Sequence, residues 1–200
     1  MTFGEIGMKN TKNNIVNFKR PACWIILVAI AACIALGVCF VISRTFVNDP
    51  NDLIQIYYHH YASGNVKKIK RIYKGLDDDH INKIKKIPDY IEEFEIVETY
   101  TKPGPDEGTY VVFVYNKAKL KEYEKLIPSI DTFYICPDRF GNLYINGEVT
   151  DEVDKYIKEM TYQSDINDLN NKVAKEYNEL YESDKDFGSL INNIRRAFSD

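Results

Sequence analysis

An uninterrupted apolar run near the N-terminus constrains this chain more than any other feature. Residues 22–43 form a stretch of 22 positions without a charged side chain, with Lys19 and Arg20 before it and Arg44 after it. As an α-helix, this stretch would extend about 33 Å, which exceeds the roughly 30 Å hydrocarbon core of a bilayer. We therefore predict one membrane-spanning helix over residues 21–44, with the lipid bilayer as the partner of residues 22–43.

The charges that flank this run predict its orientation. Four of the five charged residues before it are basic, whereas two of the first three after it are acidic. Basic flanks of a spanning helix stay on the cytoplasmic side. We expect a single-pass cell-membrane protein with a cytoplasmic tail over residues 1–20, a short tether over 45–50 and an extracytoplasmic domain over 51–200.

Residues 30–33 read Ile-Ala-Ala-Cys and resemble the cleavage site of a bacterial lipoprotein signal, which leaves an alternative open. After Cys33, however, the apolar run continues to Ile42, where a lipoprotein would have a polar tether. Residues 1–20 are also long for the start of a signal peptide. The spanning helix is the preferred interpretation, and both interpretations place the domain outside the cell at the membrane.

The composition of the outside part excludes one partner class. Residues 45–200 carry 21 Lys and Arg against 29 Asp and Glu, a net charge of −8. Because phosphate binding needs basic surface, we expect no nucleic-acid partner. About 150 residues are enough for one domain with a sizeable core. Three of the four cysteines lie in the apolar run, so Cys136 has no partner for an internal disulfide, and we expect it to be a buried small hydrophobe.

Hydrophobic periodicity predicts an α+β fold. Helical patterns cover residues 50–61, 66–74, 81–88, 153–160, 166–180 and 187–198. Strand patterns cover residues 93–100, 110–115 with an extension to 121, 130–136 and 143–145. Short turns between the strands make neighbours antiparallel. We expect helices packed on a curved four-stranded antiparallel sheet, with extra helices at the C-terminus.

Two segments of this pattern give specific core positions. In the first helix, the inward stripe is predicted to hold Leu53, Ile56, Tyr57 and Tyr61. The run Tyr110–Tyr115 is apolar at every position, which is typical of a central strand covered on both faces. We therefore expect Val112 and Val114 in the core on one face of the sheet and Phe113 on the other.

Helices under a curved antiparallel sheet resemble the nuclear transport factor 2-like fold, a cone of sheet around a helix. The segments YTKPGPDEGTYVVFVYNKAKLK and TFYICPDRFGNLYING resemble extracytoplasmic domains of uncharacterised single-pass membrane proteins from clostridial-type Firmicutes. The resemblance covers roughly residues 51–183 and implies a fold and a Gram-positive envelope location, but no activity. The overall plan is also similar to scaffold proteins of type IV secretion systems. The usual first strand of the fold, followed by a helix, is not evident in the sequence.

The histidines and one acidic triplet are the plausible metal ligands. His59 and His60 are adjacent, so on a helix they point about 100° apart and cannot easily face one ion. The residues Asp77, Asp78 and Asp79, close to His80, lack the glycine and terminal glutamate of a twelve-residue calcium loop. We expect the acids to cap a helix, and we assign no metal ligand and no cofactor.

The resembled fold includes enzymes with a Tyr/Asp or His/Asp pair inside the cone. The residues that could line such a pocket are Tyr57, Tyr61, Tyr100, Tyr110, Tyr115, Asp131 and Tyr134. Aromatic residues at core spacing are usually core, and no spacing here singles out an acid–base pair. We therefore assign no catalytic residue and expect no enzyme.

A basic run lies on the outer face of the second predicted helix, at Lys67, Lys68, Lys70, Arg71 and Lys74. It is interpreted as a solvated helix face. The alternative is contact with anionic headgroups or wall polymers, since the short tether keeps the domain near the bilayer. The acidic C-terminal helices are a second possible docking surface.

The sequence favours a membrane-anchored interaction or scaffold domain outside the cell, which would bind an envelope protein, a second copy of itself or a wall component. The alternative is an extracytoplasmic small-molecule binder or an enzyme with its site in the cone. A deep pocket with a buried carboxylate or histidine would favour the alternative, and a filled cone would favour the interaction domain.

Overall fold

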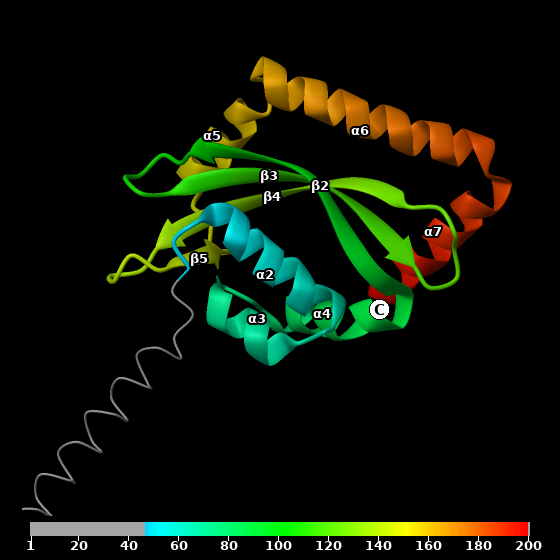
Figure 1. The fold of residues 1–200 in the computed structure, drawn as a ribbon, viewed down its shortest axis with the longest axis horizontal. Coiled ribbons are helices and arrows are strands. Elements are labelled where there is room, and N and C mark those ends of the chain that lie inside the picture. Colours follow the sequence, from blue (N-terminus) through cyan, green and yellow to red (C-terminus); the bar gives the residue numbers. More distant parts are fainter. Residues whose placement is uncertain (1–46, 200) are drawn as a thin grey trace, which may run out of the picture. The chain divides into compact units, whose positions relative to one another are not determined.

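The computed structural model describes residues 47–199 (Figure 1). The predicted cytoplasmic tail and the predicted membrane helix lie outside these residues. Among the helices that the structure describes, none is both long enough and apolar enough to cross a membrane. The described chain is an α+β domain with six helices and one five-stranded sheet, which confirms the predicted fold class at that level.

Three helices precede most of the sheet: α2 (Pro50–Ala62), α3 (Val66–Ile72) and α4 (Asp78–Tyr90). Each begins after a polar side chain that accepts a hydrogen bond from a backbone N–H of the first turn, as helix N-caps do. These caps are Asp49, Asn65 and Asp77. The predicted capping role of the acidic triplet is thereby confirmed for Asp77.

The sheet contains β1 (Tyr73–Lys74), β2 (Ile91–Pro103), β3 (Tyr110–Leu120), β4 (Ile127–Pro137) and β5 (Leu143–Asn146). Its strand order is β1-β5-β4-β3-β2. The pairs β2–β3, β3–β4 and β4–β5 are antiparallel, so the four predicted strands and their pairing are confirmed. The sheet is nevertheless mixed, because β1 adds to β5 in parallel.

The prediction of a four-stranded, purely antiparallel sheet was wrong because Tyr73 and Lys74 were assigned to the second helix. The helix ends at Ile72, and Tyr73 takes an extended backbone conformation. The backbone N–H of Gly147 donates to the Lys74 carbonyl over 2.9 Å. A Cβ atom on Gly147 would lie 2.6 Å from the Tyr73 ring, so glycine permits this close pairing.

Three helices follow the sheet: α5 (Asp151–Met160), α6 (Ser164–Ser183) and α7 (Lys185–Ser199). All three were predicted. Figure 1 shows α6 across the face of the sheet opposite α2, while α7 turns back toward α4. The Lys86 ammonium donates to the Ala197 carbonyl over 2.7 Å, and the rings of Tyr90 and Phe198 lie 5.5 Å apart. These contacts join the C-terminal helix to the helices before the sheet.

Strand β3 separates two hydrophobic clusters. Val112 and Val114 pack with Leu53 and Ile54 of α2, whereas Phe113 packs with residues of α6 on the other face. The three predicted core residues of β3 are at most 1% exposed, which confirms their assignment. The α2 cluster also includes Val47, whose carbonyl accepts a hydrogen bond from the Leu143 N–H over 2.8 Å. The folded domain thus begins within the segment expected to be a tether.

Candidate functional site

The face of the sheet under α2 is filled by aromatic side chains. Tyr57 stacks on Tyr61 with ring centroids 5.2 Å apart and meets Phe133 edge-on at 5.1 Å. Tyr58 and Tyr61 both contact Phe94 of β2, at 5.3 and 5.5 Å. Such offset and edge-on contacts are the arrangements that packed aromatic rings prefer. Aromatic side chains therefore fill the space between α2 and this face of the sheet.

A polar network that is largely buried lies beside these rings. The Tyr58 hydroxyl donates to Oδ2 of Asp131 over 2.5 Å, and Nδ2 of Asn116 donates to the same oxygen over 2.8 Å. The Ser129 hydroxyl donates to Oδ1 of Asn116 over 2.9 Å. Asn116 is fully buried and Tyr58 is 3% exposed. Each buried polar atom of this network has a partner, which is the condition for such a network to stabilise a core.

Burial controls the protonation of the tyrosines on this face. Burial raises the pKa of Tyr58 far above its usual value, and the adjacent Asp131 carboxylate raises it further. Burial likewise raises the pKa of Tyr57, and it raises that of Tyr61 to about 12. All three side chains are neutral phenols at physiological pH, so Tyr58 serves as a hydrogen-bond donor to Asp131 and is a poor acid or base.

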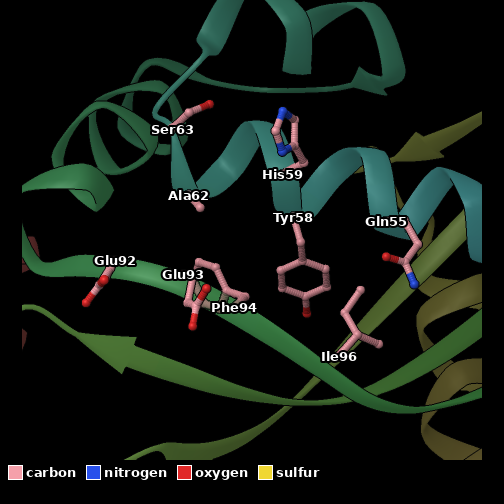
Figure 2. Close-up of a pocket in the computed structure, with 9 residues that line it drawn as sticks. All are labelled: Gln55, Tyr58, His59, Ala62, Ser63, Glu92, Glu93, Phe94 and Ile96. Carbon is pink, nitrogen blue, oxygen red and sulfur yellow. The ribbon is translucent and has the colours of Figure 1, made fainter. Parts of the chain in front are cut away.

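A cleft of about 500 Å³ lies between α2 and β2 and shares the Tyr58 side chain with this network (Figure 2). Figure 2 shows the Tyr58 ring projecting from α2 toward the sheet beside Phe94 and Ile96. Glu92 and Glu93 lie at a β-bulge at the start of β2, and their side chains form no hydrogen bond or ion pair with another residue of the described domain. The residues that line the cleft are Gln55, Tyr58, His59, Ala62, Ser63, Glu92, Glu93, Phe94 and Ile96.

The sheet divides the seven residues proposed for a cone pocket. Tyr57, Tyr61, Tyr110 and Asp131 lie on the α2 side. Tyr100, Tyr115 and Tyr134 lie on the α6 side. Their hydroxyls donate to Glu98, Glu176 and Asp106, respectively. No shared pocket collects all seven side chains, because alternate residues of a strand point to opposite faces.

Three residues of this network, Tyr58, Asn116 and Ser129, were not predicted. The inward stripe of α2 is wider than expected and includes Ile54 and Tyr58, which are four positions apart. Asn116 follows the apolar run of β3 and continues the same face as Val112 and Val114. A polar residue at that position of a buried strand was a usable signal of an internal hydrogen-bond network.

The candidate metal ligands contact one another, or a lysine, two at a time. Nδ1 of His80 lies 2.7 Å from Oδ1 of Asp77, and the rings of His59 and His60 lie 5.2 Å apart. Asp79 pairs with Lys83 over 2.6 Å. Within residues 47–199, no three ligating side chains converge as a metal site requires.

Cys136 is buried, as predicted. Its Sγ receives a long contact of 3.9 Å from the Asn146 amide. Burial raises the pKa of the Cys136 thiol, which opposes the thiolate form that reacts.

Comparisons with protein-family models, with curated proteins and with solved structures gave no match to this chain.

Proposed function

We propose that this chain is a single-pass membrane protein whose domain acts outside the cell as a non-enzymatic interaction or scaffold domain. The apolar run over residues 22–43 and its basic N-terminal flank support the anchor and its orientation. The partner is an envelope protein, a second copy of this chain or a wall component. The domain binds this partner through its outer surface.

The observation that carries this proposal is the filled concave face under α2. Three tyrosines of α2 pack against Phe94 and Phe133 where a cone ligand would lie. The carboxylate of that region, Asp131, is held by Tyr58 and Asn116. Asp131 is absent from the lining of the neighbouring cleft. The hydrogen-bonding capacity of this partly buried carboxylate is thus used within the domain.

The arrangement also supports a nuclear transport factor 2-like fold as the finer description of this domain. A helix lies in the concavity of the sheet, as that resemblance implies (Figure 1). The short strand β1, followed by α4 and then β2, stands where the resembled fold has its first strand. An experimental structure of the domain, superposed on members of that fold, would decide this assignment. A different strand order would overturn it.

The anchor and its orientation are tested by protease protection. One epitope tag is placed before Thr2 and another after Asp200, and intact wall-stripped cells are treated with protease. We expect digestion of the C-terminal tag and survival of the N-terminal tag. A Cys33→Ser variant should stay in the membrane with unchanged apparent mass. Release of that variant, or the reverse pattern of digestion, would contradict the proposal.

The interaction role is tested by photo-crosslinking in intact cells. A photoreactive phenylalanine analogue replaces, one at a time, exposed apolar residues of the domain: Val97, Phe140, Tyr162 and Tyr181. We expect a discrete adduct with an envelope protein, with this chain or with wall polymer from at least one position. The buried Phe113 is the matched negative position. Absence of adducts at all four exposed positions would contradict the proposal.

A second candidate function is small-molecule binding in the cleft between α2 and β2. Its volume of about 500 Å³ falls within the range of ligand sites. Aromatic and apolar side chains form one part of its lining, and Glu92 and Glu93 form another. This combination would suit an organic cation, because aromatic faces and carboxylates both attract positive charge. Chemical-shift changes confined to cleft residues on addition of such a compound would favour this function.

A further inference from the structure

The basic residues of α3 form an exposed patch without acidic partners, which we call the α3 basic face: Lys67, Lys68, Lys70 and Arg71. In α3, Ile69 is buried while these four side chains are exposed, so the charges share the outer side of the helix. None of the four forms an ion pair with another residue of the described domain.

The acids closest in sequence leave this face basic. The Asp77 carboxylate contacts the His80 ring, and Asp79 forms an ion pair with Lys83. Asp78 and Glu148 are exposed acids near the end of the segment. Lys74, the fifth base of the run, lies over the Tyr144 ring at 3.4 Å from its centroid. Residues 66–74 together carry five bases and no acid.

The α3 basic face lies on the side of the domain where the chain enters from the predicted membrane helix. The strand that directly follows α3, β1, pairs with β5. Val47 also contacts β5, through its hydrogen bond with Leu143. Only residues 44–46 separate Val47 from the end of the apolar run. Fully extended, three residues span roughly 11 Å, which limits how far Val47 can lie from the proposed membrane helix.

The opposite side of the sheet carries the opposite charge. Helices α5 and α6, with the turn between them, contain nine acids and four bases over residues 151–183. Figure 1 shows α6 on the face of the sheet away from α2 and α3. An anionic surface therefore attracts one side of this domain and repels the other, which gives a preferred orientation.

We propose that the α3 basic face binds anionic phospholipid headgroups and orients the tethered domain, with α3 toward the bilayer and α6 away from it. This inference rests on the proposed membrane anchor. Basic side chains near an anionic leaflet are attracted to it over a Debye length, which is about 10 Å at 0.1 M salt. The orientation leaves the exposed residues of α5 and α6 available to a partner in the envelope.

The test uses the full chain in nanodiscs that contain either phosphatidylglycerol and phosphatidylcholine or phosphatidylcholine alone. Amide hydrogen exchange is measured for residues 65–74. We expect several-fold slower exchange of this segment in the anionic discs than in the zwitterionic discs. The difference should shrink when the salt concentration is raised from about 0.05 to about 0.5 M, because salt screens the attraction.

Two triple variants with equal changes in net charge provide the control. Lys67→Gln, Lys68→Gln and Lys70→Gln together should abolish the difference between the two lipids. Lys121→Gln, Lys175→Gln and Lys185→Gln, at exposed positions elsewhere in the domain, should preserve it. Equal exchange of residues 65–74 in both lipids, or equal effects of the two triple variants, would overturn the proposal.

The same preparation tests the proposed membrane anchor separately, through the release of the chain by an alkaline wash. Chains that an alkaline wash releases from both kinds of bilayer would refute the anchor itself. Chains that stay in both bilayers but show no lipid-dependent protection would refute the basic-face proposal alone. Wall polymer as the true ligand would give protection with soluble teichoic acid in phosphatidylcholine discs and none from phosphatidylglycerol, which also overturns the proposal.

Discussion

On the α2 side of the sheet the polar groups lie inside the core, whereas on the α6 side they lie at its margin. The inner set is Tyr58, Asn116 and Asp131, joined by hydrogen bonds of 2.5 to 3.0 Å. On the other side, Tyr115 and Lys117 of β3 both reach Glu176 of α6, and Phe113 packs in a hydrophobic cluster whose tyrosine hydroxyls bond to residues at its edge.

This difference separates two ways of fixing a helix on a sheet. A buried network tolerates few alternative positions, because a shift of α2 would leave the Tyr58 hydroxyl, which is the contribution of α2 to the network, without its partners Asp131 and Asn116. Exposed ion pairs, such as Lys172 with Glu98 at 3.6 Å, contribute little and adjust easily. We infer that hydrogen bonds specify the position of α2, and that apolar packing contributes most of the stability with which α6 packs on the sheet.

The largest expected effect is loss of apolar packing on the α6 side. Phe113 is 1% exposed, so Phe113→Ala should lower the free energy of unfolding by about 3–5 kcal/mol. Urea unfolding of the fragment 47–200, followed by circular dichroism, measures this change. Val97→Ala on β2, at a side chain 41% exposed, is the control and should change stability by about 0.5 kcal/mol or less. A loss below about 1 kcal/mol for Phe113→Ala would mean that this face is open.

The next effect tests the buried network of the α2 side. Tyr58→Phe keeps the ring but removes the donor to Asp131, and a hydrogen bond to a charged group is worth about 1.5–3 kcal/mol. Tyr61 lies one turn away, and its hydroxyl forms no hydrogen bond with another residue of the described domain. Tyr61→Phe should therefore change the free energy of unfolding little. Equal unfolding free energies for the two variants would show that the network does not position α2.

A smaller effect, dependent on pH, is expected at the margin of the α6 side. The hydrogen bond from Tyr115 and then the Lys117 ammonium hold the pKa of Glu176 below its usual value. A carboxylate with a lowered pKa stabilises the fold above its unfolded-state pKa of about 4.3, and this contribution is lost as the pH falls through the folded-state pKa.

Glu176→Gln should therefore lower the urea midpoint at pH 7, and the gap from the unsubstituted protein should narrow as the pH falls below about 4. Glu159→Gln, at an exposed pair whose charged atoms lie 3.9 Å apart, serves as the control and should change the midpoint less. A gap that stays constant from neutral to acidic pH would contradict the assigned role of the Glu176 charge.

Elements with long hydrophobic patterns could be predicted from the sequence, and the shortest element could not. The run Tyr110–Tyr115 and the long C-terminal helices carry enough apolar positions to determine their type. Strand β1 has two residues and exists through pairing with β5, so no local pattern could mark it. Propensity placed Tyr73 in a helix, and tertiary pairing placed it in the sheet.

The candidate site was predicted less well for a related reason. Asp131 was chosen as a possible pocket residue, and it lies in the buried network. Its partner is Tyr58 rather than Tyr57 or Tyr61, because all three tyrosines face the core to different depths. Which of the three hydroxyls reaches the carboxylate depends on the height of α2 over β4, which periodicity does not encode.

The central claim, that the domain works through its outer surface, is tested most directly by filling the cleft between α2 and β2. Ala62→Phe places a ring in that cleft, and Ala174→Phe, at an exposed position of α6, is the matched control. We expect both variants to change the unfolding free energy by about 0.5 kcal/mol or less. The measurement is the pattern of photo-crosslinked adducts in intact cells. The account predicts that Ala62→Phe leaves this pattern unchanged. Loss of the adducts in Ala62→Phe, with a normal pattern in Ala174→Phe, would contradict it and would make the cleft the functional site.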